Sequence, residues 1–507
     1  MVESFKTYSR ENGGRVILLF LLFLLALYQL THISFSAFAI VCLIPLVCIG
    51  IYCAFKWRML SFWMLIIINY FLQMKDVAAS LPLPMSLPNE FLEITLLVIA
   101  IVDVRKNPHL ERCGNLMLFA LIIWCGFCTL EVLNDTCNLG IDIAAWYTGA
   151  RLMAFQMLYI FLVFSIYISS PEILIKYVRI WAVLSLFSVF WVWRQQYIGF
   201  TVTENIWLES GGKNTHILNA GTLIRYFSTF SDAANYGCNA AGTSVAFLIM
   251  GITAKFKKDR FLFLVTSILV AWGMFASGTR VALGALLVGL MVYIVLSKSI
   301  KIAIPFTIAF GLFVFILAFT NIGQSNQQIR RMRTAFNKDD ASAIARDHNQ
   351  EAMRKYMKEA PWGIGLGMKT ENVPANNKYY LMAKVPPDSE YVFIWIRTGI
   401  IGLTVFLTTT LLMFLGACYI VMFRLKNKSL IGIGGGMCCA FAAIQLGAYG
   451  NQVLMQFPNG VIFYGGLAIV YVLPHLEPAW IDFENRRFAE REEKKRIKLE
   501  KKLASRV

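Results

Sequence analysis

Long apolar runs separated by short polar segments recur along this chain from residue 16 to residue 474. A helix that crosses a lipid bilayer needs about 20 predominantly apolar residues. The predicted fold class is therefore all-α: a polytopic transmembrane helical bundle of about 12–14 spans, with one large outer loop that contains short helices. The predicted spans cover residues 16–31, 34–55, 59–73, 90–103, 115–133, 144–168, 178–198, 232–254, 261–277, 281–297, 302–320, 391–423, 430–448 and 459–474.

Lys and Arg lie in alternate connecting segments, which indicates how the predicted spans are oriented. Positive residues mark the cytoplasmic side of a membrane, so both termini are predicted to be cytoplasmic and the number of spans to be even. Lys75 is an exception, because it falls in a segment of the opposite set. The N-terminal segment resembles a signal peptide, but no small-residue cleavage site follows it, so we expect an uncleaved first helix.

Composition agrees with a membrane protein. The 507 residues are 58% hydrophobic and 15% charged, with mean hydropathy +0.61, whereas soluble domains carry about 25% charged residues. The net charge of +17 follows from the basic cytoplasmic segments, so it does not indicate a nucleic-acid partner. Two interpretations of the basic C-terminal tail remain, contact with anionic lipid and a solvated helical extension.

Histidine and cysteine usage does not indicate a metal site or a disulfide framework. The five histidines are scattered without ligand spacing, and the eleven cysteines lie almost entirely in apolar runs. "WCGFC" (Trp124–Cys128) resembles a redox-active dithiol. It lies inside a predicted span, however, which favours small-residue helix packing.

The runs and loops predict five regions along the chain. The large outer loop contains "SAIARDHNQEAMRKYMKEAP", an amphipathic helix with Ser342 as N-cap and Pro361 as its stop. The glycines of the following "PWGIGLG" are interpreted as a sharply bending loop rather than a dinucleotide site. The regions are N-terminal helices (1–198), an outer loop with central helices (199–320), a large periplasmic loop (321–390), C-terminal helices (391–474) and a basic cytoplasmic tail (475–507).

Several arginines lie at the outer ends of predicted spans, where positive charge is otherwise avoided. Arg225 begins "RYFSTFSDAANYG" just before a span, and Arg280 lies in the outer turn of "ASGTRVALGALL". Arg151, Arg194 and Arg397 fall in the outer thirds of their own helices. Arginines near hydrocarbon are costly and usually face a partner or a water-filled cavity.

Two interpretations of these arginines are possible. The first is snorkelling to the lipid headgroups, or a local ion pair such as Arg225 with Asp232. The second is a bound anion, which is favoured because five like charges at one membrane face tolerate each other around a negative ligand. Guanidinium groups match phosphate oxygens in pairs, so a phospholipid or a lipid-linked pyrophosphate is expected.

Four short motifs, in order along the chain, resemble the O-antigen ligase and O-antigen polymerase family. They are "RYFSTFSDAANYG", "SGTR", Arg346 placed fifteen residues before "PWGIGLG", and "PPDSEYVFIWIRTGIIGL". The resemblance covers about residues 225–410, and the N-terminal third agrees only in being a run of spans. One departure is that the family usually carries His-Asn eleven residues before the glycine of "TGIIGL", where this chain has Asp388 and Ser389.

The resemblance implies a glycosyltransferase of the bacterial inner (cytoplasmic) membrane with its active site on the periplasmic face. Its expected donor is an undecaprenyl-pyrophosphate-linked glycan. The acceptor is a lipid A–core sugar for a ligase or another glycan repeat for a polymerase, and both remain open. Membrane lipids are expected partners. No cofactor and no metal is predicted, because Asp339–Asp340 is interpreted as a loop turn.

The resemblance also implies roles for individual residues. Arg225, Arg280 and Arg346 are expected to hold the pyrophosphate, with Asp388 as the candidate base and His348 as the alternative. A lone histidine in an amphipathic helix also fits a surface or packing residue. The expected supporting residues are Asp232, Asn235, Arg151 and Arg397.

An alternative of another class is a lipid-linked oligosaccharide flippase or other polysaccharide transporter. Transporters place polar residues at the bilayer midplane and contain internal repeats. In this sequence mid-span charges are few and polar residues gather at the outer face, which favours glycan transfer.

Overall fold

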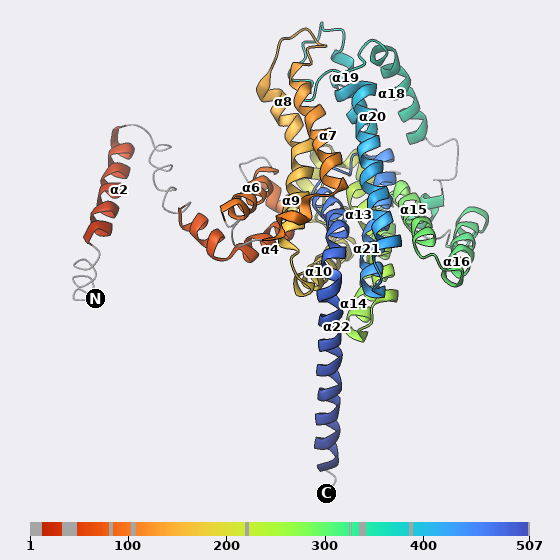
Figure 1. Ribbon diagram of the computed structural model, residues 1–507. Coiled ribbons are helices and arrows are strands. Elements are labelled where there is room, and N and C mark those ends of the chain that lie inside the picture. Colours follow the sequence, from red (N-terminus) through yellow and green to blue (C-terminus); the bar gives the residue numbers. More distant parts are fainter. Residues whose placement is uncertain are drawn as a thin grey trace. The chain divides into compact units, whose positions relative to one another are not determined.

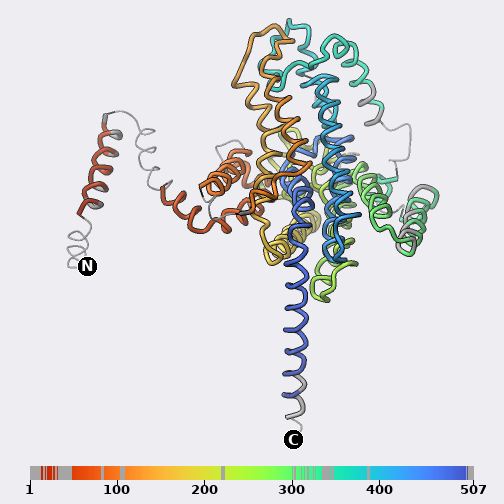
Figure 2. The backbone as a smooth tube through the Cα atoms, in the orientation of Figure 1, coloured from red at the N-terminus to blue at the C-terminus, as the bar shows by residue number. Residues whose placement is uncertain are grey.

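The computed structural model describes residues 13–32, 48–80, 85–102, 108–218, 223–323, 325, 327–333, 341–384 and 389–504, and Figure 2 traces the backbone. The chain forms two compact units, Met1–Met64 and Leu65–Val507. In the first unit, α2 (Gly13–His32) is apolar along most of its length. The helix Cys48–Lys56 is followed by α4 (Arg58–Asn69) at a bend of 104°.

The second unit is built almost entirely from helices. Its first half contains α5 (Lys75–Ser80), α6 (Leu87–Val102), η2 (Pro108–Cys113), α7 (Leu116–Leu130), η3 (Glu131–Leu133), α8 (Ile143–Ala150), η4 (Arg151–Phe155), α9 (Gln156–Tyr167), α10 (Pro171–Tyr197), α11 (Val202–Trp207), η5 (Leu208–Gly212) and α12 (Lys213–His216). A two-stranded antiparallel ribbon follows, formed by β1 (Ile217–Leu218) and β2 (Leu223–Ile224).

The second half of this unit contains the two longest described helices, α20 (Glu390–Tyr419) and α22 (Gly465–Ala504) (Figure 1). Its other elements are α13 (Ala233–Thr253), α14 (Lys257–Ala276), α15 (Arg280–Leu296), α16 (Ile300–Phe319), α17 (Gln327–Arg333), α18 (Ala341–Met357), α19 (Tyr380–Lys384), η8 (Ile420–Arg424), α21 (Lys428–Gly450) and η9 (Gly460–Tyr464).

Several of these helices can span a membrane. Within the described residues, seven are long and apolar enough, or up to eight if the bent pair Cys48–Lys56 and Arg58–Asn69 is one span. The predicted all-α polytopic bundle is therefore confirmed. The seven are Leu116–Leu133, Ile143–Tyr167, Pro171–Tyr197, Lys257–Ala276, Glu390–Arg424, Lys428–Gly450 and Gly460–Ile497.

Small residues allow the central helices to approach one another closely. A Cβ atom on Gly289 of α15 would lie 3.1 Å from the Cys439 carbonyl oxygen of α21. One on Gly436 of α21 would lie 2.9 Å from the Ala246 carbonyl oxygen of α13. Helix association in membranes relies on such backbone contact rather than on the hydrophobic effect. The "WCGFC" segment lies inside α7, which agrees with its interpretation as a helix interior.

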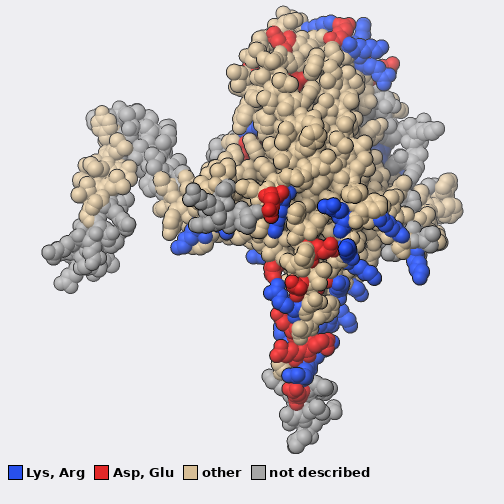
Figure 3. All heavy atoms as spheres, viewed as in Figure 1, with Lys and Arg blue, Asp and Glu red and all other residues tan. Residues whose placement is uncertain are grey.

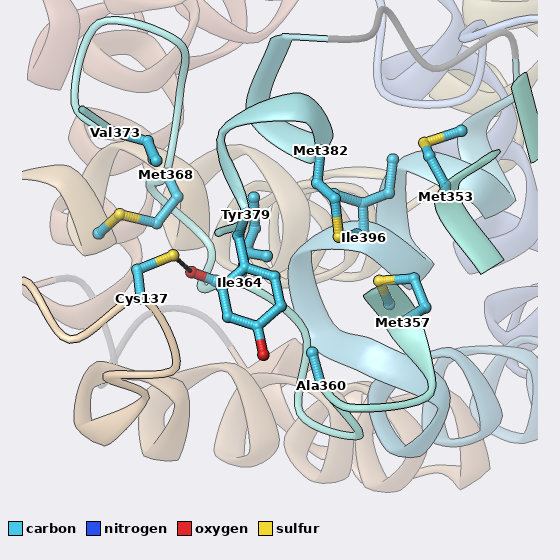
Figure 4. Packing of buried hydrophobic residues seen from close by; sticks show 10 residues of the cluster. All are labelled: Cys137, Met353, Met357, Ala360, Ile364, Met368, Val373, Tyr379, Met382 and Ile396. Carbon is cyan, nitrogen blue, oxygen red and sulfur yellow. Dashed lines mark hydrogen bonds between the residues drawn. The ribbon is translucent and has the colours of Figure 1, made fainter. Parts of the chain in front are cut away.

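The segment predicted to form the large outer loop contributes to a hydrophobic cluster of its own (Figure 4). The predicted amphipathic helix is present as α18, which begins at Ala341, one residue before the predicted cap. The cluster joins α18 and α19 to α20 and to the segment after η3, so the loop is anchored to the bundle. Its buried members are Cys137, Met353, Met357, Ala360, Ile364, Met368, Val373, Tyr379, Met382 and Ile396.

Charged side chains gather toward the ends of the second unit (Figure 3). The view shows mixed charges along the exposed part of α22 and around the neighbouring loops, with a mostly uncharged band above them. Asp259 joins three helices there, because its carboxylate accepts from Arg179 of α10 at 2.7 Å and from Arg487 of α22 at 3.0 Å. This end matches the predicted basic loops, and α22 continues as one helix to Ala504.

Candidate anion site at the start of α13 and α15

Arg225 contacts the "SGTR" turn, so the first two sequence motifs meet in the structure. Its Nε donates to the Ser277 carbonyl oxygen at 3.3 Å, and its NH2 group donates to Thr279 Oγ1 at 3.1 Å. Its NH1 group donates to the Thr215 carbonyl oxygen at 2.9 Å. These three acceptors orient the guanidinium group from three directions.

The turn that receives Arg225 requires two glycines. Gly278 has φ +59°, a left-handed conformation that costs a residue with a side chain roughly 1–2 kcal/mol. A Cβ atom on Gly237 of α13 would lie 2.4 Å from Ser277 Oγ, so only glycine lets the turn pack on α13. Thr279 Oγ1 then donates to the Ala233 carbonyl oxygen at 2.7 Å and fastens the turn to the first residue of that helix.

Two more arginines lie at the same turn. Arg280 is the first residue of α15, and Arg331 of α17 donates from Nε to the Gly278 carbonyl oxygen at 2.8 Å. Burial lowers the pKa of Arg225; Asp232 raises it, and the nearby positive charge of Arg280 lowers it further. We call Arg225, Arg280 and Arg331 the arginine cluster. Guanidinium groups grouped in this way suit an anion with several oxygens, such as a phosphate.

Arg331 was missed by the sequence interpretation. It lies in the basic run "RRMR" (residues 330–333). Three arginines within four residues are the only feature of the sequence that indicates this position. Nothing in the sequence distinguishes Arg331 from its neighbours, because its contact with Gly278 connects residues 53 positions apart. Arg330 next to it is exposed.

Asp232 caps α13, which differs from the predicted alternative of an ion pair with Arg225. Its Oδ1 atom accepts from the backbone N–H groups of Ala234 at 2.7 Å and Asn235 at 2.8 Å. His216 completes the cap, since its Nε2 accepts from the Ala233 N–H at 3.0 Å. Asp232 therefore stabilises the helix start beside the arginine cluster.

His216 is held as a neutral ring. Burial lowers its pKa to about 4, and the positive charge of Arg225 contributes in the same direction. Its side chain is 3% exposed and packs edge-on against Trp207 and Phe227. Since Nε2 accepts a hydrogen bond, the proton lies on Nδ1, which faces the Gly212 carbonyl oxygen at 3.0 Å.

The contacts of Lys75 explain why this residue departs from the pattern of basic segments. Its ammonium group donates to the Ser231 carbonyl oxygen at 2.6 Å and lies 3.9 Å from the centre of the Trp207 ring. Burial lowers its pKa to about 8, whereas the charges of Asp232 and Glu204 raise it. Lys75 is thus a structural part of the segment that carries Arg225.

Asn235 belongs to a buried amide network rather than to the arginine cluster. Its Oδ1 accepts from the side-chain amide of Asn459, and Asn459 in turn accepts from Asn239 at 2.7 Å. All three are buried within the bundle. Buried amides that satisfy one another define how α13 docks against the segment before η9.

"PWGIGLG" lies against a break in α20, which brings the third and fourth motifs together. Gly399 has φ +67° inside α20. The break frees the carbonyl groups of Ile396 and Arg397, which accept from Ile364 N at 2.9 Å and Gly365 N at 3.0 Å. A Cβ atom on Gly399 would lie 1.9 Å from the Pro361 carbonyl oxygen.

Arg397 extends from the same break. Within the described residues, its Nε and NH1 atoms are buried and have no hydrogen-bond partner. Its guanidinium carbon lies 5.4 Å from the centre of the Phe393 ring. A buried guanidinium group with open donors is compatible with the supporting role expected for it.

Two further arginines of the predicted outer set are paired elsewhere. Arg151 donates from NH2 to Ser86 Oγ at 2.9 Å and lies 3.4 Å from a carboxylate oxygen of Glu90. Arg194 lies 3.1 Å from Glu204. Their charges are therefore compensated within the protein by Glu90 and Glu204.

The remaining predicted residues lie in the outer loop. His348 is exposed on α18. Arg346 belongs to the same helix, but its side chain lies outside the described residues, as does the whole of Asp388. Ser389 and Glu390, next to Asp388, are buried: Ser389 Oγ donates to the Ala448 carbonyl oxygen at 3.1 Å, and Glu390 accepts from Leu454 N at 3.0 Å.

Fold and site together define a polytopic helical membrane protein with a cationic site at one end of its bundle. Residues 265–407 match the family model described as O-antigen ligase, which supports the resemblance found in the sequence motifs. The family implies O-antigen ligase-type membrane glycosyltransferase activity, with a lipid-linked glycan and an acceptor as substrates. No curated protein sequence matches the chain.

The matched segment runs from α14 into α20. It therefore includes Arg280, Arg331, "PWGIGLG" and Arg397, whereas Arg225 precedes it. Arg225 is connected to the family segment through its hydrogen bonds to Ser277 and Thr279 rather than through sequence proximity.

Proposed function

We propose that this protein transfers a glycan from an undecaprenyl-pyrophosphate carrier to an acceptor hydroxyl group at the periplasmic face of the bacterial inner membrane. The observation that carries the proposal is the hydrogen bond from Arg225 to Thr279, which holds Arg225 beside Arg280 at the start of α15. Arg331 adds a third guanidinium group at the same turn. The family assignment supports the transferase class.

The arginine cluster would bind the leaving group. A guanidinium group has five N–H donors, and three of those of Arg225 are used by Thr215, Ser277 and Thr279. The other two are available for a pyrophosphate oxygen. Donors that are already fixed before the reaction stabilise developing charge at little reorganisation cost.

The proposed step exchanges two bonds at the anomeric carbon. The acceptor oxygen forms a bond to this carbon while the bond to the pyrophosphate oxygen breaks, and the electron pair leaves with the pyrophosphate. The acceptor proton passes to a base, for which Asp388 is the candidate and His348 the alternative. Arg346, placed in α18 of the outer loop, is proposed to assist the cluster, and Arg397 to support it.

Arg331 offers a matched test of this site. We expect Arg331→Ala to lower glycan transfer about ten- to a hundred-fold, which corresponds to about 1.5–3 kcal/mol for a charge-assisted hydrogen bond. The exposed neighbour Arg330→Ala serves as the control and should retain activity. The measurement is transfer from lipid-linked glycan in membranes, normalised to protein amount. Equal activity of the two variants would contradict the proposed pyrophosphate site.

The proposed orientation has its own test. Both termini are proposed to be cytoplasmic, because Lys and Arg lie in alternate connecting segments of the sequence. A reporter that is active only outside the cytoplasm should work when inserted near residue 350 and fail at Val507. Reporter activity at Val507 would place the arginine cluster on the cytoplasmic face and contradict the proposed site of transfer.

The acceptor distinguishes a ligase from a polymerase, and a deletion strain separates them. Loss of a polymerase should leave surface lipid capped with a single glycan repeat. Loss of a ligase should leave bare lipid A–core while lipid-linked glycan accumulates. Unchanged surface glycan together with a defect in solute uptake would favour the transporter alternative instead.

A further inference from the structure

A cavity of about 610 Å³ lies at the end of the bundle opposite to the arginine cluster. Two helices connect the two places: α13 begins at Ala233 beside the cluster and ends at Thr253 in the cavity wall, and α15 runs from Arg280 to Leu296. The cavity is therefore a separate feature at the other membrane face.

Three cations line this cavity. They are Lys255 and Arg260, which flank the start of α14, and Lys428 at the start of α21. None of the described residues in the cavity wall is acidic. Glu484 brings a carboxylate to the cavity, because it pairs with Lys255 of the cavity wall. The same carboxylate accepts from the Asn427 side-chain amide at 2.8 Å.

The cations keep donors that can meet a ligand. Arg260 directs Nε and NH2 to the Ala254 carbonyl oxygen, at 3.2 and 2.8 Å, which fixes the guanidinium plane and leaves NH1 available. Lys428 is exposed at the cavity rim. One carboxylate against three cations leaves the cavity with a net positive charge.

The remaining wall is apolar. Tyr293 and Leu296 of α15 form one side, and Val421 and Ile431 form another. A small soluble anion would leave this apolar surface in contact with water, whereas a molecule with an acidic head and hydrocarbon chains would cover both surfaces. Basic pockets between membrane helices on the cytoplasmic side suit acidic lipid head groups.

We propose that this cavity binds the phosphodiester head group of an anionic phospholipid, with its acyl chains against the apolar wall. Lys428 and Arg260 contact the phosphate, and Lys255 shares its charge between the lipid and Glu484. This site is independent of the glycan-transfer function, since none of its residues lies at the arginine cluster.

Native mass spectrometry of the purified full chain tests the charge requirement. Phosphatidylglycerol should be retained more strongly than phosphatidylethanolamine. One basic residue near a membrane surface contributes about 1 kcal/mol, so Lys428→Gln should lower phosphatidylglycerol affinity about five-fold and Lys428→Glu should lower it further. The control is Lys258→Glu, an exposed lysine of the same end that lines a different groove, and it should leave the affinity unchanged.

A second pair of variants tests the cavity itself. A Cβ atom on Gly435 would meet its nearest neighbour, Val421 Cγ1, at 3.9 Å, so Gly435→Ala fits without strain. Gly435→Leu adds three more carbons to the cavity wall and should abolish the preference for phosphatidylglycerol. Thermal unfolding in lipid-free detergent should be similar for the two variants, which separates loss of lipid from loss of folding.

Three results would overturn the proposal. The first is equal retention of phosphatidylethanolamine by the wild-type protein. The second is inorganic phosphate that displaces phosphatidylglycerol with the same dependence on Lys428, which would make the cavity a site for soluble anions. The third is unchanged lipid preference in Gly435→Leu.

Discussion

Arg225 and Thr279, 54 residues apart, are joined by a hydrogen bond of 3.1 Å from the guanidinium NH2 group to Oγ1. The same threonine oxygen donates to the Ala233 carbonyl group at 2.7 Å. Thr279 thus links the cation before α13 to the first residue of that helix, and it directly precedes Arg280 at the start of α15.

Replacement of Arg225 by lysine should abolish most glycan transfer. A single ammonium group cannot reach the acceptors of Ser277, Thr215 and Thr279 at once and also lacks the planar fork that suits phosphate. We expect Arg225→Lys to lose activity ten- to a hundred-fold, nearly as much as Arg225→Ala, or about 1.5–3 kcal/mol. Transfer is measured in membranes at matched protein amount.

Snorkelling makes the opposite prediction, because lysine reaches the headgroups as well as arginine does. Wild-type transfer by Arg225→Lys would therefore contradict the phosphate role. The exchange Arg225→Asp with Asp232→Arg should not restore activity, since Asp232 caps α13 through Ala234 and Asn235.

Thr279→Val removes the hydroxyl group that positions Arg225 and keeps the side-chain volume, whereas Thr279→Ser keeps the hydroxyl group and removes the methyl group. Thr279 is 3% exposed, so valine fills its space but removes the acceptor of the Arg225 NH2 group and the donor to the Ala233 carbonyl oxygen, whereas serine retains the hydroxyl group. We expect Thr279→Val to lower transfer about ten-fold, in line with about 1–3 kcal/mol for an unsatisfied buried group. Thr279→Ser should remain within about three-fold of wild type. Similar losses in both variants would indicate that packing, and not the hydrogen bond, is responsible.

Gly399→Ala should destabilise the junction between "PWGIGLG" and α20. Its φ of +67° disfavours a side chain, and the new Cβ atom would lie 1.9 Å from the Pro361 carbonyl oxygen. We expect a loss of about 2–5 kcal/mol of folding free energy from backbone strain and overpacking together. The control is Gly126→Ala in α7, where no heavy atom lies within 4 Å of the new Cβ atom. Thermal unfolding in detergent would measure the difference, and equal unfolding temperatures would contradict the prediction.

Acidification should weaken the start of α13 through His216. Its pKa is lowered from 6.5 to about 4 in the folded protein, so the unfolded chain binds the proton first as the pH falls. The stabilisation is therefore complete above about pH 6.5 and is lost as the pH falls toward 4. A shift of this size corresponds to roughly 3 kcal/mol.

His216→Ala provides the comparison. Unfolding followed between pH 7 and pH 4 should have a smaller pH dependence in this variant than in wild type, at a lower stability near pH 7 because Ala233 N–H loses its acceptor. His348→Ala, an exposed position on α18, should leave the pH dependence unchanged. If the stability of His216→Ala depended on pH in the same way as that of the wild type, His216 would not be the group that makes the protein sensitive to acid.

Much of the fold could be predicted from the pattern of residues. Apolar runs such as 115–133 and 430–448 are long enough to require helices in a bilayer, and α7 and α21 confirm them. The helix of the outer loop was predicted from its amphipathic period and is present as α18. These features depend on neighbouring residues and on the solvent around them, so a single sequence contains them.

The roles of the outer arginines could be predicted only in part. The order of "RYFSTFSDAANYG", "SGTR" and "PWGIGLG" predicted the family. The position of arginines at the predicted outer ends of spans grouped Arg151 with Arg225. Arg151 is paired with Glu90, however, which lies 61 positions earlier in the chain. Sequence alone does not indicate which arginines have a carboxylate nearby.

The sequence by itself therefore determined an all-helical membrane protein, because the length of apolar run that a bilayer requires is a local property of the chain, and its motifs predicted the O-antigen ligase model that residues 265–407 match. Tertiary structure decided which cations meet. Arg225, Arg280 and Arg331 come together because Gly237 and Gly278 allow the turn between α14 and α15 to dock on α13. Such contacts depend on the close approach of distant helices, and that geometry is set by packing rather than by any local pattern.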